Sequence, residues 1–135
     1  MKQLNSIMLV DDDSTANFLH EEILNEMGIA QEIIKALNGE EALDTLSELC
    51  ALKKCPDLIL LDINMPKING FEVVEKFHKM HPTKTPPGVI VMVTSSLNPA
   101  DLRKARELGV DGYLSKPLSE EELNDILDKY FKNDD

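Results

Sequence analysis

The sequence predicts an α/β protein in which five parallel strands alternate with five helices. Short apolar runs rich in Val, Ile and Leu alternate along the chain with segments whose apolar residues recur at helical spacing. Polar residues follow the carboxyl ends of most of these runs. The length of 135 residues suits one domain with a single core. This alternation implies a parallel sheet with helices on both faces and right-handed crossovers between its strands.

The five strands are predicted at the apolar runs. Their ranges are Ser6–Val10, Glu32–Ala36, Asp57–Leu61, Val89–Val93 and Gly112–Ser115. Each run is short and apolar, as buried parallel strands are. The second run has the weakest pattern, so we expect Glu32–Ala36 to lie at an edge of the sheet.

The first helix is predicted from four apolar residues at helical spacing. Ala16, Leu19, Ile23 and Met27 define its apolar face, and Gly28 is expected to end it. The residue immediately before this helix is an aspartate, which suits an N-cap.

Capping signals mark the starts of the other four helices. Asn38 and Ser119 begin capping boxes, Asn69 opens the third helix, and Asn98-Pro99 places a proline at the first helical position of the fourth. The residues expected to face inward are Ala42, Leu46 and Leu49; Phe71, Val74 and Phe77; Leu102, Ala105 and Leu108; and Leu123, Ile126, Leu127 and Tyr130.

Composition excludes several classes of partner. The net charge of −11 argues against direct nucleic-acid binding, which relies on Lys and Arg. The start of the chain lacks the apolar segment of a signal peptide, and no apolar stretch is long enough to span a bilayer. We therefore expect a cytoplasmic protein without membrane insertion. Cys50 and Cys55 lack further zinc ligands nearby and are interpreted as two reduced thiols.

Four predicted strands are followed by side chains that suit phosphoryl transfer. These are Asp11, Asp12 and Asp13 after the first strand, Asp62 after the third, Thr94 after the fourth and Lys116 after the fifth. Ligands of open parallel α/β sheets bind at this carboxyl edge. Carboxylates gather a hard cation, a further carboxylate can act as a nucleophile, and a hydroxyl and an ammonium can hold phosphoryl oxygens.

Each of these residues taken alone also has an ordinary structural interpretation. Asp13 suits a helix N-cap, Asp62 can cap a turn, and Thr94 is a β-branched residue at a strand end. Lys116-Pro117 equally suits a strand exit before a helix. The combination at four strand ends favours a phosphoryl-transfer site.

The motifs around these residues resemble those of the receiver domains of two-component response regulators over nearly the full chain. They are Leu9-Val10-Asp11-Asp12-Asp13, Leu61-Asp62-Ile63-Asn64-Met65-Pro66 with Gly70, Met92-Val93-Thr94-Ser95, and Gly112-Tyr113-Leu114-Ser115-Lys116-Pro117. The resemblance implies a flavodoxin-like (βα)5 three-layer sandwich whose five-stranded parallel sheet has the order 2-1-3-4-5.

The resemblance also implies a metal-dependent phosphoacceptor. Asp62 is the expected site of phosphorylation. Mg2+ (or Mn2+) is expected to be held directly by Asp12 and Asp62, by Asp11 largely through water, and by the backbone carbonyl of Asn64.

Further roles follow from the same resemblance. Thr94 and Lys116 are expected to hold phosphoryl oxygens, Lys116-Pro117 to be a cis peptide, and Tyr113 to occupy an aromatic switch position. Inward movement of Thr94 after phosphorylation would vacate space into which Tyr113 turns. The surface expected to change comprises the helix from Pro99, the strand Gly112–Ser115 and the helix from Ser119.

The expected protein is a stand-alone signalling receiver and not an enzyme, although it promotes its own phosphoryl transfer and dephosphorylation. Residues 1–135 are expected to form one receiver domain with a core at about 5–131 and no effector domain. A histidine kinase or phosphotransfer protein would supply the phosphoryl group, and the output would be a downstream protein target. We expect a monomer or a phosphorylation-dependent dimer.

Other classes of site are excluded by individual residues. Haloacid-dehalogenase-like phosphatases need a second Asp two residues after the nucleophile, where this chain has Asn64. A flavin-binding flavodoxin needs a phosphate loop rich in Ser, Thr and Gly after the first strand, where the acidic run would repel the flavin phosphate. An EF-hand is excluded because Ala16 stands where its loop needs glycine.

Overall fold

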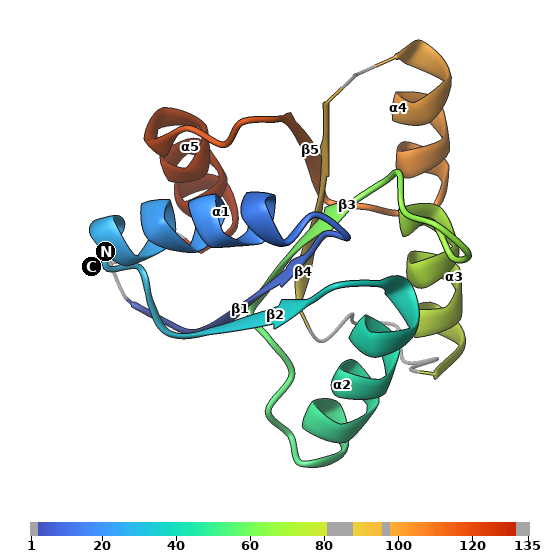
Figure 1. Ribbon diagram of the computed structural model, residues 1–135, viewed down its shortest axis with the longest axis horizontal. Helices are drawn as coiled ribbons and strands as arrows, with labels where there is room; N and C mark the ends of the chain where they lie inside the picture. The colour runs from blue at the N-terminus through green and yellow to red at the C-terminus, as the bar shows by residue number, and fades with distance from the viewer. Residues whose placement is uncertain (1–2, 81–87, 96–97, 132–135) are drawn as a thin grey trace.

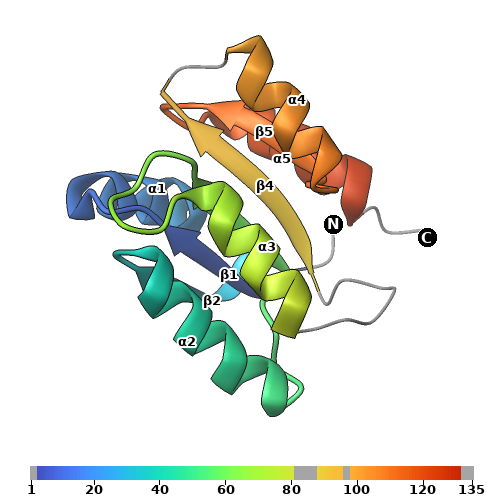
Figure 2. The same ribbon diagram turned by 90° about the vertical axis from the view of Figure 1, so that its right-hand side faces the viewer.

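The computed structural model describes residues 3–80, 88–95 and 98–131 and has the predicted alternation of strands and helices. Figures 1 and 2 show a twisted parallel sheet with α1 and α5 on one face and α2, α3 and α4 on the other. The strands are β1 (Leu4–Val10), β2 (Ala30–Ala36), β3 (Leu58–Asp62), β4 (Val89–Thr94) and β5 (Gly112–Ser115). The helices are α1 (Ser14–Met27), α2 (Gly39–Ala51), α3 (Gly70–Met80), α4 (Pro99–Glu107) and α5 (Glu120–Tyr130).

The order of the strands is β2-β1-β3-β4-β5, and every pair of neighbours is parallel. This confirms the flavodoxin-like fold and the edge position of the second strand. Each predicted strand shifts or lengthens by at most two residues at an end, except the fifth, which is unchanged. Because all the strands point the same way, their carboxyl ends meet at one edge of the sheet.

Alternation along the strands divides the core into two layers. In β1, Met8 and Val10 pack in the layer below α2, α3 and α4, whereas Ile7 and Leu9 pack in the layer that also contains Leu24 of α1. Successive strand residues point to opposite faces, so one apolar run supplies both layers. Burial of these side chains provides the main stabilisation of the sheet.

Capping residues begin the helices as predicted. The Asn38, Asn98 and Ser119 side chains accept hydrogen bonds from the backbone three residues later. Asn69 and the third residue after it form a reciprocal capping box at α3, with contacts of 3.0 and 2.9 Å. Gly28 has a left-handed conformation with φ of 62° and ends α1.

The predicted apolar face of α1 is partly wrong. Leu19 is 54% exposed, whereas the buried positions of this helix are Asn17, His20 and Leu24. Ile23 is only partly buried and packs against the rim of the core. The helix is therefore rotated so that two polar side chains face the sheet.

Cys50 and Cys55 form a disulfide, so the prediction of two reduced thiols is also wrong. Cys50 lies in the last turn of α2, and the chain reverses through Lys53, which has a positive φ of 60°. This turn brings the two Cα atoms to 4.4 Å, within the range for a disulfide. Spacing in the sequence does not specify this distance.

None of the helices in the described ranges is long and apolar enough to cross a bilayer.

Candidate functional site

The carboxyl edge of the sheet brings the predicted site residues together. Asp11 directly follows β1, Asp62 is the last residue of β3, and Thr94 is the last residue of β4. Lys116 directly follows β5, and its backbone N–H donates to the Thr94 carbonyl at 2.8 Å. The strands β1, β3, β4 and β5 are consecutive neighbours in the sheet. Residues distant in sequence therefore lie side by side.

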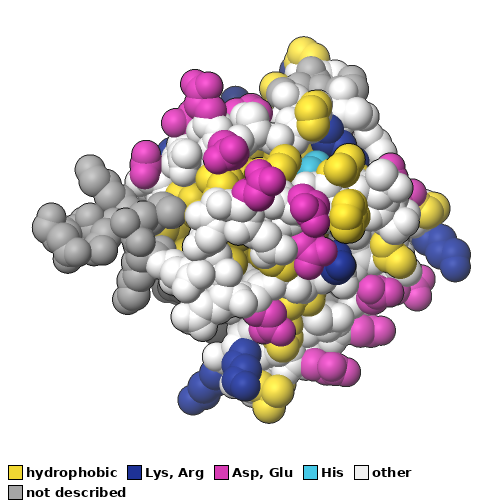
Figure 3. All heavy atoms as spheres, turned by 60° about the vertical axis from the view of Figure 1, so that its left-hand side comes forward, with side chains coloured by type: hydrophobic (Ala, Val, Ile, Leu, Met, Phe, Trp, Pro, Cys, Tyr) yellow, Lys and Arg dark blue, Asp and Glu magenta, His cyan; other side chains and the backbone are white. Residues whose placement is uncertain are grey.

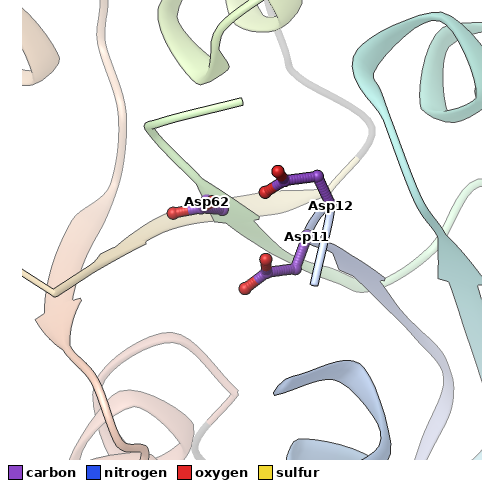
Figure 4. A group of neighbouring side chains, drawn as sticks. All are labelled: Asp11, Asp12 and Asp62. Atoms are coloured by element: carbon purple, nitrogen blue, oxygen red, sulfur yellow. The ribbon is translucent and has the colours of Figure 1, made fainter. Parts of the chain in front are cut away.

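Three carboxylates form an acidic cluster that can hold a metal ion. One carboxylate oxygen from each of Asp11, Asp12 and Asp62 lies within 4.8 Å of the others. Asp11 and Asp62 are only 3% and 5% exposed, whereas Asp12 is open to solvent. Figure 4 shows the three side chains projecting in the same general direction from the ends of β1 and β3. Access to the cluster is therefore from the side of Asp12.

Lys116 neutralises part of this negative charge. Its Nζ lies 2.6 Å from Oδ2 of Asp11 and 3.4 Å from Oδ1 of Asp62. The peptide bond between Lys116 and Pro117 is cis. The ammonium thus lies closest to the Asp11 carboxylate, directly after β1, while remaining within ion-pair distance of the Asp62 carboxylate on β3.

The electrostatic environment shifts the pKa of both partners. Burial, together with the charge of Asp11, raises the pKa of Asp62 to about 6, although Lys116 and a hydrogen bond from the backbone of Asn64 oppose this shift. Burial by itself would lower the pKa of Lys116, but its contacts with Asp11 and Asp62 raise it. Asp62 is therefore a carboxylate that becomes neutral in mildly acidic solution, unlike an exposed Asp.

The donor chemistry of the cluster fits a hard divalent cation. Mg2+ prefers oxygen ligands and retains several waters, so a few carboxylates at one open edge are sufficient. The like charges of Asp11, Asp12 and Asp62 also repel one another without a cation. Asn64, two residues after β3, has an exposed side chain, which leaves its backbone as the part that faces the Asp62 carboxylate.

The two predicted switch residues occupy neighbouring strands. Thr94 is fully buried at the end of β4. Tyr113 of β5 is half-buried and is the register partner of Met92, two residues before Thr94. The Tyr113 hydroxyl accepts a hydrogen bond from Nη2 of Arg106 in α4 at 3.3 Å. This contact links the fifth strand to the fourth helix.

Two buried polar residues of α1 were missed by the sequence analysis. Asn17 and His20 face the sheet near the acidic cluster, at helical spacing with Leu24. Burial lowers the pKa of His20; the charge of Asp11 opposes this effect and that of Lys116 adds to it. The available signal was the spacing of these residues, but hydrophobic periodicity does not detect polar side chains that are buried.

A shallow groove with a largely apolar lining adjoins the acidic cluster. It runs between α1 and the start of the segment after β5, and its lining includes Leu19, Ile23, Lys116 and Pro117. Figure 3 brings the left-hand side of Figure 1 forward and shows hydrophobic side chains among many acidic ones on that face. Leu19 is thus exposed beside the site and not in the core.

Comparisons with known proteins agree with this geometry. Residues 7–128 match the family described as response regulator receiver domain. The transcriptional regulatory protein CpxR of Escherichia coli strain K12 is 37% identical over 120 residues, which are 89% of this chain and 46% of that protein. The chain therefore spans less than half the length of this curated relative.

Solved structures show the same architecture. A two-component response regulator from Cytophaga hutchinsonii superposes with a TM-score of 0.89 at 36% identity, covering 98% of this chain and all of the other. The receiver domain of the histidine kinase CKI1 from Arabidopsis thaliana, complexed with Mg2+ and BeF3−, superposes with a TM-score of 0.85 at 22% identity, covering 96% and 91% of the two chains. The second likeness concerns the fold alone.

Proposed function

Because this chain belongs to the response regulator receiver domain family, we propose that it is a phosphorylation-dependent switch whose phosphoacceptor is Asp62. A receiver domain is a signalling module and not a true enzyme. The phosphoryl group comes from a histidine kinase or a phosphotransfer protein, and the output is control of a partner protein. Residues 1–135 act as one receiver domain. Phosphorylation of this kind is typical of the family.

One observation carries the proposal. Asp62 ends β3, which lies between β1, whose end is followed by the other two acidic residues, and β4, which ends at Thr94. It also lies 3.4 Å from the Lys116 ammonium. A phosphoryl group on Asp62 would thus lie beside the metal-binding carboxylates, the Thr94 hydroxyl and the Lys116 ammonium. Neither Asp11 nor Asp12 has Thr94 at a neighbouring strand end, because β3 and not β1 pairs with β4.

The chain's own residues perform the transfer mainly by positioning and charge. One oxygen of the ionised Asp62 carboxylate forms a bond to phosphorus, while the bond from phosphorus to the donor histidine nitrogen breaks and its electron pair stays on that nitrogen. Lys116 moves from its contact with Asp11 toward a phosphoryl oxygen, and the Thr94 hydroxyl donates to another. Such fixed charges and donors stabilise the transition state.

The proposed metal is Mg2+ or Mn2+. Asp11, Asp12, Asp62 and the Asn64 carbonyl would hold it, Asp11 largely through water. When bound, such an ion neutralises charge on the phosphoryl oxygens. Mg2+ with BeF3−, the pair present in the Arabidopsis structure, is a suitable probe of this site in the present chain.

The proposed output surface consists of α4, β5 and α5. A phosphoryl oxygen beside Thr94 would accept a hydrogen bond from its hydroxyl, and movement of this side chain toward that oxygen changes the packing around β4. Tyr113 then leaves its contact with Arg106 and turns inward. Two discrete arrangements of one half-buried aromatic side chain are suitable for a switch.

The test is phosphorylation by a small acyl phosphate in the presence of Mg2+. Mass spectrometry should show one added phosphoryl group on the wild type, and peptide mapping should place it at Asp62. Asp62→Asn should remove the label, whereas the control Asp44→Asn, at an exposed position of α2, should retain it. Undiminished labelling of Asp62→Asn would contradict the proposal, because another carboxylate would then be the acceptor.

A further inference from the structure

Asn17 is a buried polar residue that contacts both the Asp11–Asp13 loop after β1 and the end of β2. It lies in the first turns of α1 and is only 2% exposed. Its Nδ2 donates to the backbone carbonyl of Asp11 at 3.1 Å and to that of Ala36 at 3.2 Å. These carbonyls belong to the ends of neighbouring strands β1 and β2. One amide group therefore connects both strand ends to the helix.

The carbonyl of Asp11 has a direct geometric influence on the acidic cluster. It belongs to the peptide group that joins Asp11 to Asp12, and a peptide group is planar. By holding this carbonyl, the Asn17 side-chain amide also holds the plane of the peptide group that leads into Asp12. The placement of the Asp12 carboxylate relative to that of Asp11 depends on this plane.

Other hydrogen bonds hold the same loop through groups other than the Asp11 carbonyl. The Asp11 N–H donates to Ala36 at 3.1 Å, and the Asp13 N–H donates to Oδ1 of Asp11 at 3.0 Å. The former aligns β1 with β2, and the latter orients the Asp11 side chain. Asn17 contributes a further donor, which binds the carbonyl of the peptide group between Asp11 and Asp12.

The orientation of the Asn17 amide has a cost. Within the described part of the chain, its buried Oδ1 has no hydrogen-bond partner. A buried oxygen without a partner destabilises the fold. Reversing the amide would place this oxygen against two carbonyl oxygens, so the Nδ2 donation determines the orientation. Asn17 thus keeps both hydrogen bonds from Nδ2 although its Oδ1 makes none within the described residues.

We propose that Asn17 is a positioning residue for the divalent metal site, acting through the Asp11–Asp12 peptide. The inference rests on the proposed function in that it assumes a metal bound by the acidic cluster. Without the amide, the mutual repulsion of Asp11 and Asp12 favours their separation. Binding of the cation must then bring these carboxylates back together against their repulsion, and this free-energy cost reduces the affinity for the cation.

The test measures metal affinity and stability separately. Asn17→Leu removes the donor at similar side-chain size, and Asn17→Ala removes it with a smaller side chain that favours the helix. Titration calorimetry with Mg2+ should show affinity reduced by about tenfold or more for each variant, as for other groups that orient metal ligands. At saturating Mg2+, labelling by an acyl phosphate should return toward the wild-type rate.

The matched control is Leu24→Ala, a cavity variant two turns further along the same helix, where the side chain is buried in the apolar core. It should lower the denaturant midpoint yet bind Mg2+ with wild-type affinity. Affinity within twofold of wild type in both Asn17 variants would overturn the inference while leaving the proposed function intact. Absence of Mg2+ binding by the wild type would overturn the metal site itself and this inference with it.

Discussion

The Lys116 ammonium lies 2.6 Å from the Asp11 carboxylate and thereby joins the end of β5 to the end of β1 across two intervening strands. The same ammonium is 3.4 Å from Asp62. Lys116 is thus shared between two buried carboxylates before any phosphoryl group arrives. Proton, metal ion and phosphoryl group should all compete with this ion pair for the acidic cluster.

The raised pKa of Asp62 predicts a specific pH dependence of stability. The pKa of Asp62 is about 6 in the folded state and 3.8 in the unfolded state. The stabilising contribution of its protonated form to the free energy of unfolding is therefore fully present below pH 3.8 and is lost as pH rises through about 6. In metal-free protein, Asp62→Asn should therefore become more stable than wild type by on the order of 1 kcal/mol above pH 6. Urea unfolding from pH 4 to pH 8 measures the difference. A difference that is constant across this range would contradict the assignment.

Removing one charge of the acidic cluster should separate metal binding from stability. Asp12→Asn should weaken Mg2+ binding by at least about tenfold, while metal-free protein gains up to about 1 kcal/mol from reduced repulsion. Thermal melts with and without Mg2+ provide both values.

The control for this variant is Asp13→Asn. Asp13 is exposed and caps α1 by accepting from the Thr15 N–H at 2.9 Å, a role that Asn fulfils equally well. The control changes the net charge by the same amount but should keep the Mg2+-dependent increase in melting temperature. An unchanged increase in Asp12→Asn would exclude Asp12 as a ligand.

Gly70 should be required for the position of Asp62. A Cβ at Gly70 would lie 2.5 Å from the Asp62 carbonyl oxygen and 2.9 Å from the Ile63 Cα. Gly70→Ala should therefore destabilise the fold by about 1–3 kcal/mol through overpacking and slow acyl-phosphate labelling. Gly112→Ala is the control, since its Cβ would meet no atom closer than 3.5 Å. Equal labelling rates in the two variants would contradict the prediction, because they would show that a shift of the backbone at Asp62 does not impair labelling.

Thr94 should connect phosphorylation to the output surface. Thr94→Ala should still be labelled at Asp62, but amide exchange of α4 and the environment of Tyr113 should stay as in unphosphorylated protein. In wild type, labelling should disrupt the contact between Tyr113 and Arg106. NMR spectra of both proteins, before and after treatment with Mg2+ and BeF3−, would measure this. Changes confined to the loop after Asp62 in the wild type would refute the mechanism.

The sequence predicted the fold because buried parallel strands leave a direct signal. Apolar runs such as Leu58-Ile59-Leu60-Leu61 are long enough to identify, and the polar residue that ends each run marks the functional edge. The first helix was harder because its orientation is determined by polar groups. Asn17 finds acceptors among backbone carbonyls in the fold, and the sequence shows no sign of such partners.

Distances between groups were a second source of error. The Cys50–Cys55 disulfide depends on how the chain turns after α2, which the spacing of two cysteines does not determine. Likewise, the sequence placed Lys116 near the carboxylates, but its closer approach to Asp11 than to Asp62 follows from side-chain packing.

The ends of β1, β3, β4 and β5 all contribute to one site, with residues that range from Asp11 to Lys116. No contiguous fragment shorter than most of the chain contains them together. A nascent or partly unfolded chain therefore lacks an assembled acceptor, because the groups converge only when the long-range strand pairings are complete. The proposed phosphorylation consequently requires the intact fold, and an incompletely folded or damaged molecule would not accept the phosphoryl group.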